Sequence, residues 1–246
     1  MKITGILFDA NGTLIDILTD EGREDIYRAI GCFLAYQGLA IPPISLREMY
    51  FRTMEEQRKQ RNCPHPEFDA VKLWGAILDA HTDSLRIPVT KRRQLPRILA
   101  EMFRALSRIR LDLYPDVGSV LDQLSQSYRM AVVSDGQSAW ALPELRETGI
   151  AGYFDPIVVS GDHGFRKPDR RLFDAALSAM GQTPENVVFV GNDIYRDIYG
   201  ARRVGMKTVF FRSNQGRQEM EGVEPDYIIY RFRELPQAIA FLEQNH

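Results

Sequence analysis

Two hydrophobic patterns divide this chain of 246 residues. One consists of short apolar runs that end in polar residues or glycine, as buried strands do. These runs predict a first strand that ends at Asp9 and later strands over Met130–Ser134, Pro156–Ser160, Val187–Val190, Lys207–Phe211 and Tyr227–Tyr230. Helical periodicity between the later runs predicts helices over 116–127, 140–148, 169–180 and 197–204. Strands that alternate with helices predict an α/β fold with a doubly wound parallel sheet.

The second pattern occupies residues 17–112, where apolar residues recur every three or four positions. This spacing predicts helices over 20–36, 45–62, 67–81 and 90–108. Ser45 and Glu48 match a capping box at a helix start, and prolines 42, 43 and 88 are expected to separate helices. We therefore expect an all-helical domain over 17–112, inserted into a core domain made of 1–16 and 113–246.

Composition narrows the class of protein. A net charge of −2 gives no electrostatic reason to bind nucleic acid or a membrane. No apolar stretch approaches the roughly 20 residues that span a bilayer, and the run before Asp9 is too short for a signal peptide. Cys32 and Cys63 form no CxxC pair and indicate a reducing compartment, so we expect a cytoplasmic protein. The sequence does not indicate the oligomeric state.

Charge is distributed unevenly between the two expected domains. Residues 17–112 hold 16 of the 31 Lys and Arg residues but 13 of the 33 Asp and Glu residues. A mildly cationic helical domain above an acidic core suits a small anionic substrate held beside a cation. Arg23, Arg47 and Arg52 are candidates to face such a substrate.

Polar residues gather where the predicted strands end. Because parallel strands of an open α/β sheet carry ligands at their carboxyl ends, these residues are candidates for one site. They are Asp9, Asn11, Gly12 and Thr13 after the first strand, Ser134, Asp135 and Gly136 at the second, Lys167 before a helix, and Asn192, Asp193 and Asp197 after the strand at 187–190.

In order and spacing, these four segments resemble motifs I to IV of the haloacid dehalogenase-like (HAD) hydrolase superfamily, in its subfamily I with a helical cap. The resemblance covers residues 1–16 and 113–215, and the region between them fits the family's cap. It implies a Rossmann-like core. Since most members are Mg²⁺-dependent phosphatases, it also implies that a small phosphorylated metabolite is hydrolysed through an aspartyl-phosphate intermediate on Asp9.

The resemblance further implies a metal site. Mg²⁺ would be held by Asp9, by the backbone carbonyl of Asn11 and by an acid of motif IV, and oxygen ligands of this kind suit a hard cation. We take Asp193 as that acid, with Asn192 or Asp197 as the alternative ligand or as a supporting residue.

Other residues would bind the phosphate. The Ser134 hydroxyl, with the backbone amides of Asp135 and Gly136, would donate hydrogen bonds to phosphate oxygens. Lys167 would neutralise the charge shared by the nucleophile and the transferring group. Thr13 would orient the nucleophile or the metal loop.

Asn11 departs from the phosphatase pattern, which has Asp at this position as general acid and base. An amide provides neither function, and such catalysis is worth about 10²–10⁴-fold. Three interpretations stay open: a slow phosphatase, which we favour; another hydrolysis such as 2-haloacid dehalogenation; or a non-catalytic binding or regulatory protein. The dehalogenase branch has Asp-Ala-Tyr-Gly-Thr in motif I, which is similar to Asp9-Ala-Asn-Gly-Thr13 here.

Overall fold

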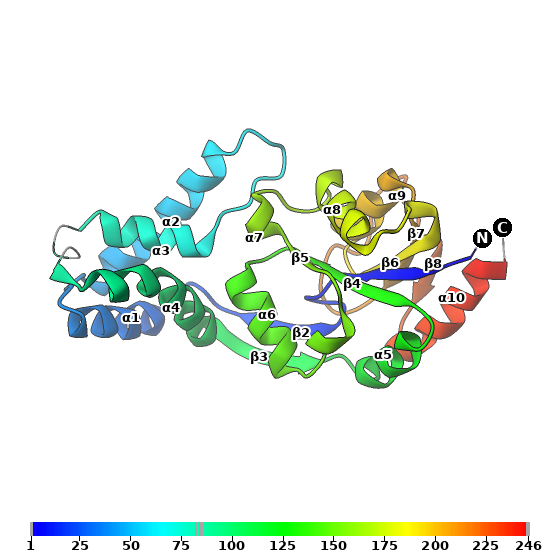
Figure 1. Cartoon of the computed structure of the whole chain (residues 1–246), viewed down its shortest axis with the longest axis horizontal. Coiled ribbons are helices and arrows are strands. Elements are labelled where there is room, and N and C mark those ends of the chain that lie inside the picture. Colours follow the sequence, from blue (N-terminus) through cyan, green and yellow to red (C-terminus); the bar gives the residue numbers. More distant parts are fainter. Residues whose placement is uncertain (1, 82, 84–85, 245–246) are drawn as a thin grey trace.

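The computed structural model describes residues 2–81, 83 and 86–244. Its centre is a six-stranded sheet in the order β5-β4-β1-β6-β7-β8, in which every neighbouring pair is parallel (Figure 1). The chain starts in the middle of the sheet and extends it in both directions, so the predicted doubly wound α/β class is confirmed. The strands are β1 (Gly5–Phe8), β4 (Arg129–Ser134), β5 (Ile157–Val159), β6 (Val187–Gly191), β7 (Lys207–Phe211) and β8 (Tyr227–Ile229).

Helices pack on both faces of this sheet, which buries the strands on both sides. In β1, Ile6 and Phe8 enter one hydrophobic cluster and Leu7 enters another. This two-sided burial explains why the strands are continuous apolar runs. The core helices are α5 (Val117–Ser125), α6 (Ser138–Glu147), α7 (Ser160–His163), α8 (Arg170–Met180), α9 (Gly200–Val204) and α10 (Leu235–Gln244), of which α7 and α10 were not predicted.

The inserted segment contains four α-helices in its described part: α1 (Glu24–Tyr36), α2 (Pro43–Gln60), α3 (Ala70–Asp79) and α4 (Val89–Ser107). They surround a hydrophobic cluster of their own, in which Tyr50, Trp74 and Phe103 are fully buried. The capping box at Ser45 is wrong, because α2 already begins at Pro43. A proline at the first helical position has the required φ and needs no hydrogen-bond donor.

The insertion is not helical at its two connections to the core. There β2 (Ile15–Thr19) pairs antiparallel with β3 (Arg108–Leu113) in a two-stranded ribbon. The sequence analysis missed this ribbon and expected helix as far as residue 108. Its strands are short and mostly solvent-facing on one side, with Leu18 and Ile109 exposed, so their apolar residues do not form a buried run.

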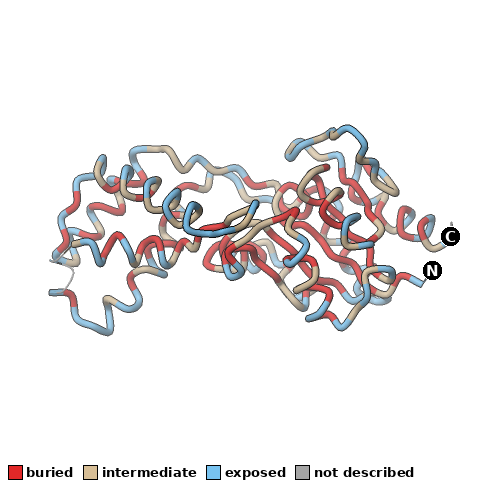
Figure 2. Tube along the Cα trace, turned by 90° about the horizontal axis from the view of Figure 1, so that it is seen from above, coloured by how far each residue is buried: buried red, intermediate tan, exposed pale blue. Residues whose placement is uncertain are grey.

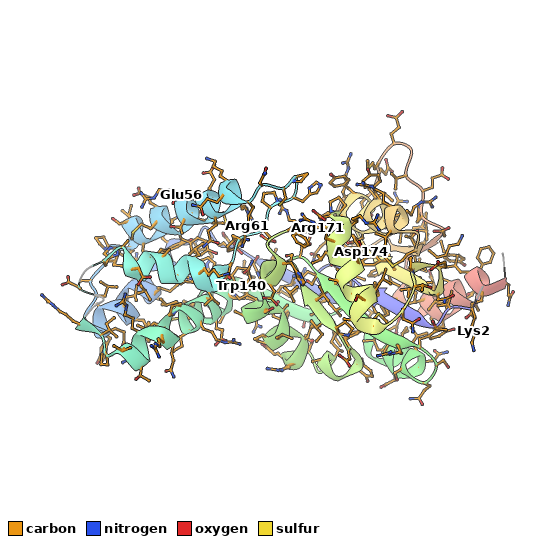
Figure 3. The ribbon with its side chains drawn as sticks, turned by 45° about the horizontal axis from the view of Figure 1, so that its top comes forward. Lys2, Glu56, Arg61, Trp140, Arg171 and Asp174 are labelled. Atoms are coloured by element: carbon orange, nitrogen blue, oxygen red, sulfur yellow. The ribbon has the colours of Figure 1, made fainter. Side chains whose placement is uncertain are left out.

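The helical insertion and the sheet lie end to end in an elongated molecule (Figure 2). Trp140 of the core helix α6 lies where they meet and belongs to the hydrophobic cluster of the insertion (Figure 3). Its indole N–H donates to the carbonyl of Ala100 in α4 at 2.8 Å. The two parts are therefore joined by packed side chains as well as by the ribbon. No helix in the described residues is long and apolar enough to cross a membrane.

Candidate active site

The carboxyl ends of β1, β4 and β6 meet at the centre of the sheet, because β1 pairs with both other strands. Asp9 directly follows β1, and its backbone amide donates to the Val190 carbonyl of β6 at 2.9 Å. Ser134 is the last residue of β4. The fold thus places residues that are more than a hundred positions apart in one site, as the motif spacing predicts.

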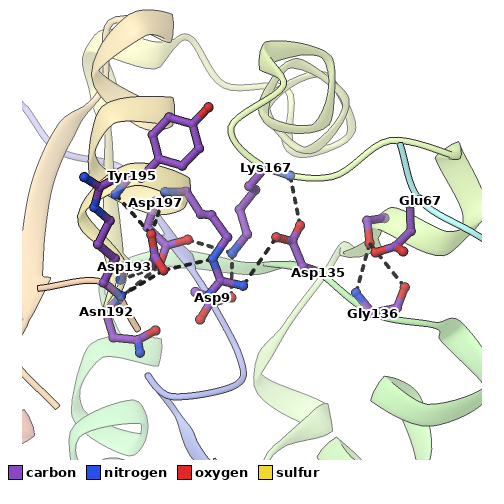
Figure 4. A network of polar contacts seen from close by, with 12 residues as sticks. Asp9, Glu67, Asp135, Gly136, Lys167, Asn192, Asp193, Tyr195 and Asp197 are labelled. Carbon is purple, nitrogen blue, oxygen red and sulfur yellow. Dashed lines mark hydrogen bonds and ion pairs between the residues drawn. The ribbon is translucent and has the colours of Figure 1, made fainter. Parts of the chain in front are cut away.

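Lys167 is the centre of the charge arrangement (Figure 4). Its ammonium donates to Asp9 Oδ1 at 2.5 Å and to Asp197 Oδ1 at 2.7 Å, and all three side chains are buried. Burial alone would lower the pKa of Lys167, but the charges of Asp197, Asp9 and Asp135 raise it well above its usual range. Burial raises the pKa of Asp197 to about 6, although the Lys167 charge opposes this shift. Lys167 is therefore a permanent cation that holds the candidate nucleophile.

Asp197 shapes the loop that follows β6. Its Oδ2 accepts hydrogen bonds from the backbone amides of Asn192 and Asp193, both at 3.0 Å. The Asp197 side chain also requires glycine at residue 191, because a Cβ there would lie 2.5 Å from the Asp197 Cβ. With one oxygen bonded to Lys167 and the other to two amides, Asp197 has the geometry of the supporting residue that the sequence analysis offered as one of its alternatives.

Asp193 has a different position from the one expected. It is the N-cap of the π-helix η4 (Ile194–Tyr199), where its Oδ1 accepts from the amides of Tyr195 and Arg196. Its Oδ2 accepts from Arg196 Nε and from the Arg217 amide, each at 3.0 Å. Burial would raise the pKa of Asp193, but these hydrogen bonds lower it. Its two oxygens together accept four hydrogen bonds, which fills their lone pairs, so the geometry does not support our preference for Asp193 as the metal ligand.

Thr13 links Asp9 to Asn192. Its hydroxyl lies 3.2 Å from Asp9 Oδ2 and 3.1 Å from Asn192 Oδ1, whereas the buried Asn192 Nδ2 has no partner. One hydroxyl proton serves only one acceptor at a time. Rotating the Asn192 amide by 180° resolves both problems, because Nδ2 then donates to Thr13 and Thr13 donates to Asp9. In that arrangement the Asn192 oxygen is left without a protein partner.

The oxygen donors near Asp9 suit a hard cation but carry little charge. The described residues contain no group of three or more His, Cys, Asp or Glu side chains that could hold a metal ion. The Asp9 carboxylate, the backbone carbonyl of Asn11 and the amide oxygen of Asn192 remain, and Mg²⁺ accepts all three donor types. The donor types therefore fit Mg²⁺, with one negative charge among them.

The Asn11 turn is built by glycine. Gly12 has φ of +90°, and its amide donates to the Ile15 carbonyl at 2.8 Å. A Cβ at this position would lie 2.3 Å from Asn192 Nδ2, so only glycine fits. The Asn11 side chain makes no hydrogen bond within the described part of the chain.

The candidate phosphate-binding residues follow β4. The Ser134 hydroxyl is fully buried and has no hydrogen-bond partner, so it is available to a ligand. Asp135 instead holds the lysine loop, because its Oδ1 accepts from the Lys167 amide at 2.9 Å. Burial raises the pKa of Asp135. The Gly136 amide donates to Ser160 Oγ at 2.9 Å, which corrects the expectation that it is free to bind phosphate.

The three arginines proposed from the sequence do not reach this site. Arg23 pairs with Asp25, Arg52 pairs with Glu56, and Arg47 donates to the Gly22 carbonyl. All of these contacts lie within the helical insertion.

The sequence analysis also missed Arg196. Its guanidinium lies 3.0 Å from Asp193 and 3.8 Å from Asp135. Burial would lower the pKa of Arg196, but Asp193 and the neighbouring carboxylates raise it. The only signal in the sequence was its position three residues after an Asp that can cap a helix.

Known proteins resemble this chain over its length. A family model described as haloacid dehalogenase-like hydrolase matches residues 3–205. The glyceraldehyde 3-phosphate phosphatase of Methanopyrus kandleri is 30% identical over 99% of this chain and 100% of its own. Proteins with the same name from Pyrococcus furiosus and Methanothermobacter thermautotrophicus are 31% and 38% identical, and the chain spans about half (50%) of each. A 2-haloacid dehalogenase from Pseudomonas syringae pv. Tomato DC3000 shares the fold, with a TM-score of 0.69 and 23% identity over 98% of this chain and 99% of its own.

Proposed function

Because the chain belongs to the haloacid dehalogenase-like hydrolase family, we propose that it is a Mg²⁺-dependent phosphatase of a small phosphorylated metabolite. The observation that carries this proposal is the buried Asp9 carboxylate, held by Lys167 at the end of β1, with the unpaired Ser134 hydroxyl at the end of the neighbouring strand β4. A carboxylate nucleophile, a fixed cation and a free donor are what phosphoryl transfer requires. Relatives whose names describe phosphatases of small metabolites support the same substrate class.

In the proposed reaction a carboxylate oxygen of Asp9 attacks phosphorus, and the bond to the ester oxygen breaks. Lys167 holds the other oxygen of Asp9 and offsets its charge, so that the nucleophile stays oriented as an anion. Ser134 donates a hydrogen bond to a phosphoryl oxygen. Mg²⁺, when bound by Asp9, Asn11 and Asn192, supplies the remaining positive charge. Water then hydrolyses the aspartyl phosphate, which restores Asp9 and releases phosphate.

Asn11 limits this reaction, because it cannot protonate the leaving alkoxide or activate the water. Good leaving groups need little protonation, so we propose that the wild-type protein favours activated esters. The test compares an alkyl with an aryl phosphate in Asn11→Asp, which changes an amide to a carboxylate of nearly equal size. The variant should gain ten-fold or more on the alkyl ester, out of the roughly 10²–10⁴-fold available, and less on the aryl ester.

Matched variants make this test specific. Asp9→Asn should abolish turnover of both esters in a folded protein, in which Lys167 keeps Asp197 as its partner, and Asn11→Ser should give no gain. Turnover that persists in Asp9→Asn would exclude the proposed nucleophile. A stable Asn11→Asp variant that binds Mg²⁺ but gains on no phosphate ester would exclude a phosphatase limited by acid–base catalysis.

A dehalogenase remains the second candidate, because the site has amides at Asn11 and Asn192 and so has a low negative charge. Attack of a carboxylate on a carbon–halogen bond needs neither a metal nor a proton for the leaving halide. Halide release from 2-haloacids in EDTA, together with no phosphate release in Mg²⁺, would establish this activity instead.

We also propose that residues 17–112 act as a cap domain that selects the substrate, whereas the core carries out the cleavage. The hydrogen bonds of Gln137, in the loop after β4, with Phe68 and Ala70 support this role, because the same loop carries candidate phosphate-binding residues. Substitutions in the cap should therefore change the ranking of substrates rather than one common rate.

A further inference from the structure

A chain of contacts leads from the candidate phosphate site into the cap. The Gly136 amide donates to Ser160 Oγ, and that hydroxyl lies 3.0 Å from Glu67 Oε2 of the cap (Figure 4). The other oxygen of Glu67 pairs with Arg58 of α2 at 3.4 Å. Glu21 lies 3.9 Å from Arg104, whose guanidinium lies over the Trp140 ring. The Trp140 ring contacts Phe68, and the Arg58 guanidinium lies over Phe68, so Glu21 belongs to the same group. Polar side chains thus continue from the β4 loop into the cap.

Several members of this group have unsatisfied hydrogen-bonding atoms. The Tyr50 hydroxyl is completely buried without a partner, and the buried Nε of Arg58 also has none. Glu21 accepts no side-chain hydrogen bond in the described part of the chain, and its nearest cation, on Arg104, is 3.9 Å away. Buried polar groups are normally paired, and an unpaired one costs free energy that a ligand can recover.

Contacts with neighbouring residues hold Glu21 and Tyr50 in place. The Glu21 carbonyl accepts from Tyr27 Oη at 2.8 Å, which fixes the turn between the ribbon and α1. The Tyr50 ring stacks on Phe103 with centroids 4.2 Å apart. The side chains of Glu21 and Arg58 are each 31% exposed, so a ligand can reach them.

We propose that Glu21, Arg58 and Tyr50 bind the end of the substrate that is remote from the phosphate, and that this end both donates and accepts hydrogen bonds. Glu21 requires a donor, whereas Arg58 and Tyr50 supply donors that require an acceptor. This inference rests on the proposed phosphatase function and adds the chemistry of the substrate.

The charges of the cluster exclude two other substrate ends. Three carboxylates, of Glu21, Glu67 and Glu144, lie near two guanidinium groups, of Arg58 and Arg104. A second phosphate would face the Glu21 carboxylate, and an apolar end would leave the polar atoms unpaired. Two ends fit: neighbouring hydroxyl groups, or an ammonium facing Glu21 with a carboxylate facing Arg58.

The test measures kcat/KM for glycerol 3-phosphate, O-phosphoserine, fructose 1,6-bisphosphate and phenyl phosphate in the presence of Mg²⁺. Because the proposed reaction favours activated esters, phenyl phosphate serves as the reference, and the relative preference for an ester is its kcat/KM divided by that for phenyl phosphate. In the wild-type protein this relative preference should be higher for glycerol 3-phosphate or O-phosphoserine than for fructose 1,6-bisphosphate. In Tyr50→Phe and Glu21→Gln it should fall by about ten-fold or more for glycerol 3-phosphate or O-phosphoserine. A larger loss for O-phosphoserine in Glu21→Gln identifies an ammonium, and equal losses identify hydroxyl groups.

Arg52→Gln is the matched control, because Arg52 lies on the same helix as Arg58 but is 65% exposed. This control should leave the preference unchanged, and circular dichroism should show that all variants are folded. Equal losses on every ester in Tyr50→Phe and Glu21→Gln would overturn the inference, as would a wild-type relative preference that is highest for the bisphosphate. Failure of the wild-type protein to hydrolyse any of the four esters would overturn the proposed function instead.

Discussion

Replacement of Lys167 by methionine isolates the charge on which the candidate site depends. Methionine keeps most of the volume of the side chain but leaves the Asp9 and Asp197 carboxylates facing each other in a buried space. Removing one partner of a buried ion pair costs about 3–5 kcal/mol. Because two carboxylates lose the same cation, we expect the upper part of this range at pH 7 in metal-free protein, together with loss of turnover.

The pH dependence of that loss is a second, independent signature. Burial raises the pKa of Asp197 to about 6 in the wild type against the opposing Lys167 charge, so removal of Lys167 raises this pKa further above its unfolded value. A raised carboxyl pKa lowers stability as pH rises through the interval between the two values. The deficit of Lys167→Met should therefore shrink between pH 7 and pH 5, by up to about 1.4 kcal/mol for each unit by which the Asp197 pKa rises.

Denaturant unfolding in EDTA, followed by circular dichroism at both pH values, measures these quantities. The double variant Lys167→Met/Asp197→Asn should regain part of the lost stability, because one of the unpaired charges is gone, but no activity. A deficit below about 1 kcal/mol, or an equal deficit at both pH values, would show that the buried charges are not coupled as described.

Three further perturbations test other parts of the structure. Burial would raise the pKa of Asp226, but hydrogen bonds from Lys207 and Thr208 lower it below its usual value of 3.8. The ionised Asp226 should therefore stabilise the fold above pH 3.8 and lose this effect below it. The stabilities of the wild type and Asp226→Asn should converge in acid. Gly216 has φ of +76° and lies against the main chain after β6, so Gly216→Ala should lower both the melting temperature and turnover. Trp140→Ala should cost about 3–5 kcal/mol in denaturant unfolding.

Much of the fold could be predicted from the sequence because the central strands are buried on both faces. A strand such as Val187–Gly191 has no solvent side, so its apolar run is uninterrupted and easily recognised. The same argument located Asp9 and Ser134, since a polar residue that ends such a run lies at the carboxyl edge of the sheet. Lys167 has no such strand signal and was located by its motif.

Other features depend on contacts that a linear pattern does not contain. Both Asp193 and Asp197 follow β6, and only the start of η4 between them decides which one caps a helix and which one bonds to Lys167. The Gly136 amide bonds to Ser160 because the short helix α7 begins beside the β4 loop. Arg58 was not distinguished from the other arginines of the insertion, because its position depends on how α2 packs within the insertion and brings it to Glu67 and Phe68.

The two amides in the site have one consequence for the order of binding. With Asp193 engaged in a helix cap, Asp197 bonded to Lys167, and Asn11 and Asn192 uncharged, Asp9 is the one carboxylate among the proposed metal ligands. Mg²⁺ is commonly held by one or two carboxylates together with substrate phosphate oxygens. A phosphate group would here supply much of the missing negative charge, so metal and substrate should bind together, each raising the affinity of the other by the same factor. In a site with two further carboxylate ligands, the cation would bind first and independently of the substrate. Asn192→Asp adds a carboxylate to the metal site, so Mg²⁺ binding should depend less on the substrate than in the wild type. The factor by which substrate raises the Mg²⁺ affinity should therefore be smaller in this variant.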